Sequence, residues 1–135
     1  MDTAPEIIRV RLLGAEHAVV LPRSIIEQEE LYTAWREVTA AKKPGMRTLR
    51  IACALVGMCT RVGRHAGVTY DEAGSNPAAY GGRIYDWMVD HGGTDGVVAA
   101  AVAIDAVLTA ALLARAEAPK KAAFFARSAE PVTEA

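Results

Sequence analysis

The histidines of this chain could bind a metal or transfer protons, but their spacing argues against both. His17, His65 and His91 lie far apart, and none stands in an H-E-x-x-H or C-x-x-C motif. Because metal sites need clustered ligands at defined spacing, we expect no bound metal. His91 directly precedes Gly92-Gly93, a position at the end of a helix where a histidine interacts favourably with the helix dipole.

Two carboxylates, Asp86 and Asp90, are four residues apart and share one face of a helix. Together with His91 they could form an acid–base site at an oligomer interface, if a pocket with convergent polar groups existed there. A solvated helix face explains the same spacing without any chemistry. We therefore treat an enzyme of this kind as the third hypothesis for the function.

Asp105 is an isolated carboxylate within an apolar helical stretch. A buried carboxylate must find a cationic or hydrogen-bonding partner, or else become protonated. Arg50, Arg61 and Arg83 are the candidate partners. Since no nucleophile or second carboxylate converges on Asp105, we interpret it as half of an ion pair that fixes the register of two helices.

The thiols of Cys53 and Cys59 are candidate nucleophiles. They are six positions apart in one helical pattern, which separates them by roughly 9 Å along the axis and places them on different faces, so they cannot bridge each other. Apolar surroundings raise the pKa of a thiol and suppress the reactive thiolate. Two free thiols favour a reducing compartment, the cytoplasm, and the acidic start MDTAPEII has no export signal.

The segment Tyr80-Gly81-Gly82 resembles a phosphate-binding loop only in its glycines. It follows no strand and lacks the lysine and hydroxyl of a P-loop, so close helix packing explains it better. The sequence therefore predicts no catalytic residue, no cofactor and no metal, and a protein that is not an enzyme.

The composition of the chain indicates which kind of secondary structure must position these candidate residues. The chain has 135 residues, of which 52% are hydrophobic but only 6% aromatic, which favours closely packed helices with much alanine in one domain. Fifteen basic and sixteen acidic side chains leave a net charge of −1. A chain without a basic field is not expected to bind nucleic acid.

The hydrophobic pattern predicts a mainly α fold, a compact bundle of about four helices with a short N-terminal β-hairpin and a flexible C-terminal arm. The hairpin covers residues 6–21, with a break from Gly14 to His17. Ser24 caps a helix over about 25–41, an all-round apolar and hence central helix runs from about 49 to 62, and 63–75 is a loop. Asn76-Pro77 begins a helix that presents Tyr80, Ile84, Trp87 and Met88 on one face, Gly92-Gly93 ends it, and Thr94-Asp95 caps a helix over 97–114.

The stretch from Val97 to Ala114 is long enough to span a membrane. It is dominated by alanine, contains Asp105 near its middle and has no aromatic belt, which favours a buried helix of a soluble protein. We expect no membrane partner.

The last residues, 119–135, form the predicted arm, and residues 1–118 form the single helical domain. The arm, which has a basic pair at its start and an acidic, proline-containing end, carries Phe124-Phe125. Two large rings on a polar segment either dock back on the bundle or anchor a partner protein.

The order of the hairpin, the helix around LRIACALVGMCTRVG, the segment YGGRIYDWMVDHGG and the ending AAFFARSAE resembles that of bacteriophage tail assembly chaperones, over about Val10 to Glu130. This resemblance implies binding to tape measure and tail tube proteins through apolar and aromatic surface. On that basis, the predicted partner-binding residues are Tyr85, Trp87, Phe124 and Phe125. The chain lacks the strongly acidic C-terminal extension of the commoner chaperones and is richer in alanine, which leaves a structural tail or neck component as an alternative.

The first hypothesis is therefore a non-enzymatic phage tail assembly protein, a chaperone or minor tail component. It would bind other tail proteins or itself in the host cytoplasm or in the virion. The second is a small cytoplasmic adaptor or regulator that binds a partner helix in an apolar groove lined by Trp87 and Met88.

Overall fold

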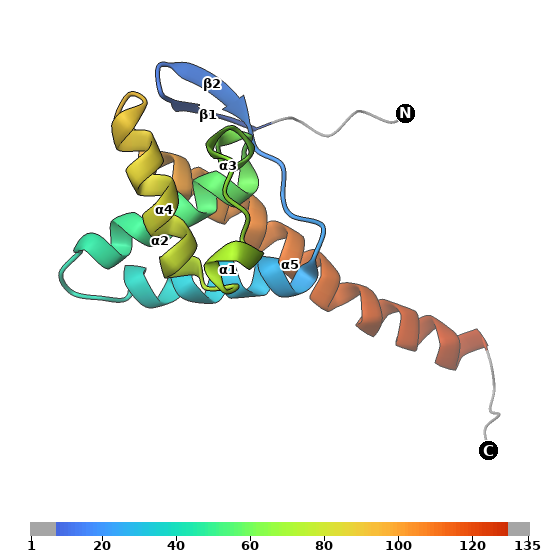
Figure 1. Ribbon diagram of the computed structural model, residues 1–135. Helices are drawn as coiled ribbons and strands as arrows, with labels where there is room; N and C mark the ends of the chain where they lie inside the picture. Colours follow the sequence, from blue (N-terminus) through green and yellow to red (C-terminus); the bar gives the residue numbers. More distant parts are fainter. Residues whose placement is uncertain (1–7, 130–135) are drawn as a thin grey trace.

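The computed structural model describes residues 8–129, with side chains as far as Ala116, and has the predicted mainly helical architecture (Figure 1). A hairpin stands at one end of a helical bundle, and the last helix extends away from it. In chain order the elements are β1 (Arg9–Leu12), β2 (Ala15–Ala18), α1 (Ile25–Thr39), α2 (Met46–Cys59), α3 (Val62–Ala66), the 3-10 helix η1 (Asp71–Ala73), α4 (Pro77–Asp90) and α5 (Val97–Ala129).

The hairpin turns earlier than its sequence suggested. β1 and β2 are antiparallel, and Leu12 pairs with Ala15, so only Leu13 and Gly14 form the turn. Both turn residues have positive φ, 54° and 75°, as in the two-residue turns that match the twist of a hairpin. The predicted break from Gly14 to His17 was wrong because this tight turn needs no further residues. Val10 and Leu12 alternate into the core.

Helix ends follow the local signals in the sequence. The Ser24 hydroxyl accepts a hydrogen bond from the Glu27 backbone N–H at 3.2 Å, and the Asn76 side chain accepts one from the Ala79 N–H at 3.1 Å. α4 is followed by Gly92 and Gly93, both with positive φ. These three predicted boundaries are confirmed, because each depends on residues only a few positions apart.

The prediction that residues 63–75 form a loop is wrong. This segment contains most of α3 and all of η1. Gly67 and Gly74 adopt the left-handed conformation, with φ of 72° and 76°, directly after these short helices. The two glycines therefore end helical turns rather than mark a continuous loop.

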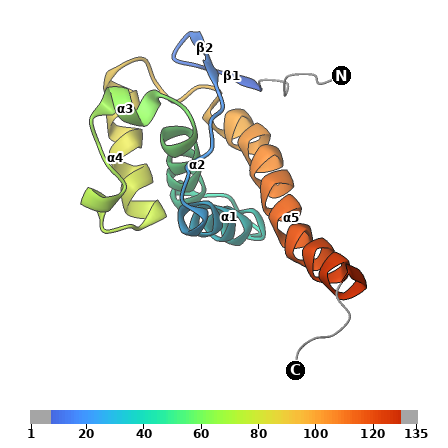
Figure 2. The same cartoon turned by 90° about the vertical axis from the view of Figure 1, so that its right-hand side faces the viewer.

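α2 is the central helix, as its all-round apolar pattern predicted. It contacts α1, α3, α4 and α5, and Figure 2 shows it among the other helices. Every residue from Ile51 to Gly57 is buried, as is Cys59. A helix buried on all sides needs neighbours that approach on each of them.

The closest of these approaches is between α2 and α4. A Cβ atom added at Gly81 would overlap the carbonyl oxygen of Arg50 on α2. One added at Gly57 would lie 2.8 Å from Cγ1 of Ile84 and 2.9 Å from the hydroxyl of Tyr80. Close helix packing is thus the structural role of Tyr80-Gly81-Gly82, as predicted.

α5 begins within the bundle and continues beyond it. Its core-facing residues pack against α2, α1 and β1; they are Val97, Ala100, Ala101, Ile104 and Leu108. The helix was predicted to end near Ala114 and the arm to begin at Pro119, but α5 continues to Ala129 and projects from the bundle (Figure 1). The side chains of Phe124 and Phe125 lie outside the described residues.

Replacing Gly81 with alanine should force α2 and α4 apart and lower the free energy of unfolding by at least about 2 kcal/mol. Gly82→Ala is the matched control, because its nearest foreign atom would be Cδ of Arg50 at 3.6 Å, an ordinary contact. That variant should be neutral or gain up to about 1 kcal/mol from helix propensity. Urea unfolding followed by circular dichroism measures both, and equal effects would contradict the backbone-contact argument.

Candidate functional site

The outward face of α5 is apolar and exposed. We call it the α5 face and define it by Ala99, Val102, Ala106, Ala110 and Leu113, which recur every three or four residues on the side opposite the core. Val102 is 57% exposed and Leu113 is 59% exposed. An apolar helix face with no neighbour among the described residues is characteristic of a contact surface.

The stretch Val97–Ala116 is the one helix among the described residues that is long and apolar enough to cross a membrane. This reflects length and composition alone and is weak evidence, because a core helix of a soluble protein has the same properties. Only 28% of the stretch is buried inside the structure. The prediction of a buried helix therefore holds for one face of α5 and is wrong for the other.

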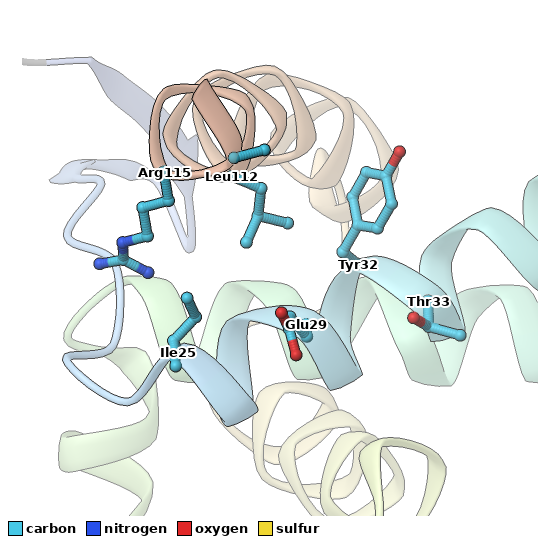
Figure 3. Close-up of a pocket in the computed structure, with 7 residues that line it drawn as sticks. Ile25, Glu29, Tyr32, Thr33, Leu112 and Arg115 are labelled. Carbon is cyan, nitrogen blue, oxygen red and sulfur yellow. The ribbon is translucent and has the colours of Figure 1, made fainter. Parts of the chain in front are cut away.

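A cleft of about 490 Å³ lies between α1 and the far part of α5 (Figure 3). Ile25, Tyr32 and Leu112 supply its apolar surface, and Glu29 and Arg115 add opposite charges from the two helices. Arg115 also donates a hydrogen bond from Nη1 to Oε1 of Gln28 at 2.8 Å. The cleft exists because α5 leaves the bundle here and no longer packs fully on α1.

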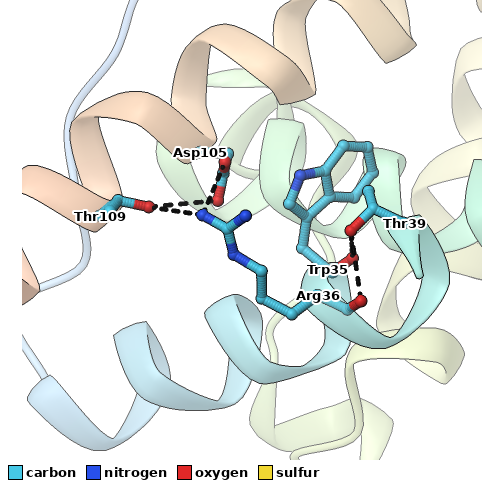
Figure 4. A network of polar contacts seen from close by, with 5 residues as sticks. All are labelled: Trp35, Arg36, Thr39, Asp105 and Thr109. Atoms are coloured by element: carbon cyan, nitrogen blue, oxygen red, sulfur yellow. Dashed lines mark hydrogen bonds and ion pairs between the residues drawn. The ribbon is translucent and has the colours of Figure 1, made fainter.

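Asp105 joins α5 to α1 through a small polar network (Figure 4). Nη2 of Arg36 lies 3.3 Å from Oδ2 of Asp105 and donates to the Thr109 hydroxyl at 3.1 Å. The Asp–Arg pair was predicted, but Arg50, Arg61 and Arg83 were the wrong partners. Asp105 lies on the flank of α5 that faces α1, and this orientation depends on tertiary packing. Both side chains are partly exposed, so the ion pair contributes at most about 1 kcal/mol to the free energy of unfolding.

A second cleft, of about 470 Å³, brings together residues from α1, α2, α3, η1 and α4. We call it the tyrosine cleft; its polar and aromatic lining includes Glu27, Arg64, Tyr70, Asp71 and Tyr80. The rings of Tyr70 and Tyr80 meet edge to face with centroids 5.7 Å apart. The sequence gave no indication of this cleft, because its residues span more than fifty positions without a motif.

The electrostatics of the tyrosine cleft are unfavourable to negative charge. The Tyr70 hydroxyl donates a 2.6 Å hydrogen bond to Oε1 of Glu30. Partial burial raises the pKa of Glu27 above its usual value, and the nearby carboxylates of Asp71 and Glu30 raise it further. Burial also raises the pKa of Tyr80, to about 12. Both tyrosines are therefore neutral hydroxyl groups near neutral pH.

The predicted contact residues on α4 do not join either surface. Trp87 is half-buried and stacks on the ring of His91, with centroids 4.2 Å apart, while Nδ1 of His91 hydrogen-bonds to the Trp87 carbonyl oxygen at 2.8 Å. Tyr85 is half-buried at a shallow cleft beside Arg50. Met88 is fully buried, at 0% exposure, so the predicted groove lined by Trp87 and Met88 is wrong. The ring of Tyr80 occupies the core side of α4 along with Met88.

The groups considered for catalysis remain separate. Cys53 and Cys59 are both free and buried, and burial raises the pKa of each thiol to about 12. Asp86, Asp90 and His91 are exposed near the end of α4. Within the described part of the chain, no three histidine, cysteine, aspartate or glutamate side chains come close enough together to hold a metal ion.

Comparisons with protein-family profiles, with curated proteins and with solved structures give no match.

The two cysteines should not react with a thiol-specific disulfide reagent while the protein is folded. Both are fully buried and protonated at neutral pH, and the thiolate is the reacting species. Absorbance of the released thiol should rise only after urea is added. An Ala79→Cys variant, exposed at the start of α4, should react at once and controls for the reagent. Rapid reaction of two thiols in the folded parent protein would contradict the buried environment.

Glu27 should make the stability of the protein depend on pH. The pKa of Glu27 is raised in the folded state, so around and above the usual pKa of a glutamate the folded protein binds more protons than the unfolded chain does. The free energy of unfolding therefore falls as the pH rises through this range. Glu27→Gln lacks this loss, so its free energy of unfolding relative to the parent should increase from about pH 4 to about pH 7.

Urea unfolding at several pH values measures this difference. Glu29→Gln, which removes a charge from the same helix outside the tyrosine cleft, is the control. A relative stability of Glu27→Gln that does not change with pH would count against the carboxylate repulsion.

Proposed function

We propose that this chain is a non-enzymatic phage tail assembly protein, a chaperone or minor tail component, that binds another protein through the α5 face. The observation that carries the proposal is the exposed apolar side of α5, whose largest side chains, Val102 and Leu113, are more than half exposed. The resemblance in element order to phage tail assembly chaperones supports the choice of partner class, and the host cytoplasm is the proposed location.

The composition of the α5 face suits a helical partner. Small alanine side chains at 99, 106 and 110 allow the backbone of a second helix to approach closely, and Val102 and Leu113 would fill its grooves. None of the five residues carries a charge that would have to be desolvated on contact. The proposed occupant is an apolar helix of a tape-measure-type or tail tube protein, or α5 of a second copy.

The predicted aromatic contacts remain part of this proposal. Phe124 and Phe125 lie beyond Leu113 in the same helix, and we keep them as predicted partner contacts. Tyr85 and Trp87 belong to α4, and we retain them as a separate, secondary contact.

The cleft between α1 and α5 favours a second candidate function, a cytoplasmic adaptor that holds a partner helix. Its apolar lining of Ile25, Tyr32 and Leu112 replaces the groove expected at Trp87 and Met88. A partner in this cleft would contact Glu29 and Arg115 rather than the α5 face. Substitutions in the cleft and on the α5 face therefore distinguish the two candidate functions.

Val102→Glu and Leu113→Glu should each weaken capture of tail proteins by about tenfold or more, because each places a charge within an apolar contact. The measurement is affinity purification of the tagged chain co-expressed with its neighbouring genes, with quantification of retained proteins by mass spectrometry. Val89→Glu is the matched control, since Val89 on α4 is also half exposed, at 51%. All three variants should keep the stability of the parent to within about 0.5 kcal/mol.

Three outcomes would count against the proposal. If Ile25→Glu abolishes capture while Val102→Glu does not, the adaptor function is favoured. Retention of no tail protein by the parent chain contradicts a role in tail assembly. If the parent protein floats with neutral lipid vesicles and Val102→Glu does not, the α5 face contacts lipid rather than protein.

A further inference from the structure

The tyrosine cleft lies apart from the α5 face and has no role in the function proposed above. Its polar groups come from separate elements: Glu27 from α1, Asp71 from η1 and Tyr80 from α4. Such convergence of polar groups at a concave surface is the usual mark of a ligand site.

The carboxylates of this cleft have no cationic partner within the described side chains. The ion pairs there join Arg36 to Asp105 and Arg47 to Glu37, and neither involves Glu27, Glu30 or Asp71. Arg64 lines the cleft but lies beyond ion-pair distance of both Glu27 and Asp71. The repulsion between the carboxylates, which raises the pKa of Glu27, therefore remains uncompensated.

The Tyr80 hydroxyl is the second observation that points to a ligand. Tyr80 is only 2% exposed, yet its hydroxyl has no hydrogen-bond partner among the described residues. Every buried side-chain nitrogen or oxygen atom among the described residues has a hydrogen-bond partner, so the unpaired Tyr80 hydroxyl oxygen is accessible to solvent. It therefore opens into the cleft that Tyr80 lines. Gly57 and Gly63 make room for the hydroxyl itself, because a Cβ atom at Gly63 would overlap it and one at Gly57 would lie 2.9 Å from it. A hydroxyl that belongs to a buried ring but is open to an acidic cleft is free to accept a hydrogen bond from a ligand.

We propose that the tyrosine cleft binds an alkylammonium or guanidinium group, with Glu27 and Asp71 as counter-charges and the Tyr80 hydroxyl as a hydrogen-bond acceptor. A cation with N–H donors fits because it satisfies all three acceptors together. The ring of Tyr70 at the cleft adds a favourable aromatic surface for the cation. A metal ion fits less well, because no three carboxylate, thiol or imidazole groups of the described residues converge closely enough to hold one.

This chemistry has two sources, a lysine or arginine side chain of a protein or a free polyamine. Titration of the ¹⁵N-labelled full chain with Nα-acetyl-lysine methylamide, Nα-acetyl-arginine methylamide and spermidine distinguishes them by nuclear magnetic resonance. The uncharged N-butylacetamide and sodium chloride are the ligand controls. Amide signals of Thr69, Tyr70 and Asp71 should shift in a saturable manner with the cations only.

Glu27→Gln and Tyr80→Phe should each weaken binding of the best cation by about three- to tenfold, whereas Glu29→Gln should not. Tyr80→Phe keeps the ring that packs against α2, so it is expected to fold, and the dispersion of the spectrum checks this. Tighter binding of the amino acid derivatives than of spermidine identifies a protein side chain as the ligand, and the reverse identifies a polyamine.

The proposal is overturned if the uncharged amide or sodium chloride causes the same shifts, or if Glu27→Gln binds the cations as well as the parent does. Val102→Glu should bind the cations normally. Its behaviour separates failure of this site from failure of the α5 face.

Discussion

The contact between Gly81 on α4 and the carbonyl oxygen of Arg50 on α2 is the constraint on which the rest of this structure depends. α2 is buried on all sides, so each neighbouring helix must lie directly against it. The missing side chain at Gly81 lets two backbones meet, and the same approach places Tyr80 and Ile84 over Gly57. Core and tyrosine cleft therefore share one geometric cause: a wider spacing between α2 and α4 would withdraw the Tyr80 hydroxyl from its position.

The two candidate surfaces differ in chemistry in a way that suits a chain with almost no net charge. The α5 face is apolar and uncharged, whereas the tyrosine cleft is polar and carries the carboxylates of Glu27 and Asp71. Apolar contact supplies affinity with little directional demand, while a charge-assisted hydrogen bond supplies discrimination between ligands. The two proposals together assign a broad apolar contact and a selective polar contact to one small domain.

The sequence was sufficient to predict the structure wherever the deciding residues are close together in the chain. Ser24, Asn76 and Gly92 set helix ends through residues a few positions away, and the all-round apolar pattern of α2 identified the central helix. Where partners are distant in sequence, the prediction failed. Arg36 is sixty-nine residues from Asp105, and only the rotation of α5 about its axis selects it over Arg50. The tyrosine cleft was missed for the same reason, since its residues come together only when four α-helices and the 3-10 helix η1 have been placed.

The central position of α2 also has a consequence for biosynthesis. The chain is made from its N-terminus, so α1, α2 and α4 leave the ribosome before α5. Until α5 follows, the side of α2 that packs against α5 has no cover, and the nascent chain exposes apolar surface that attracts chaperones or other nascent chains. The core is therefore complete only once α5 has been synthesised and has packed against α2.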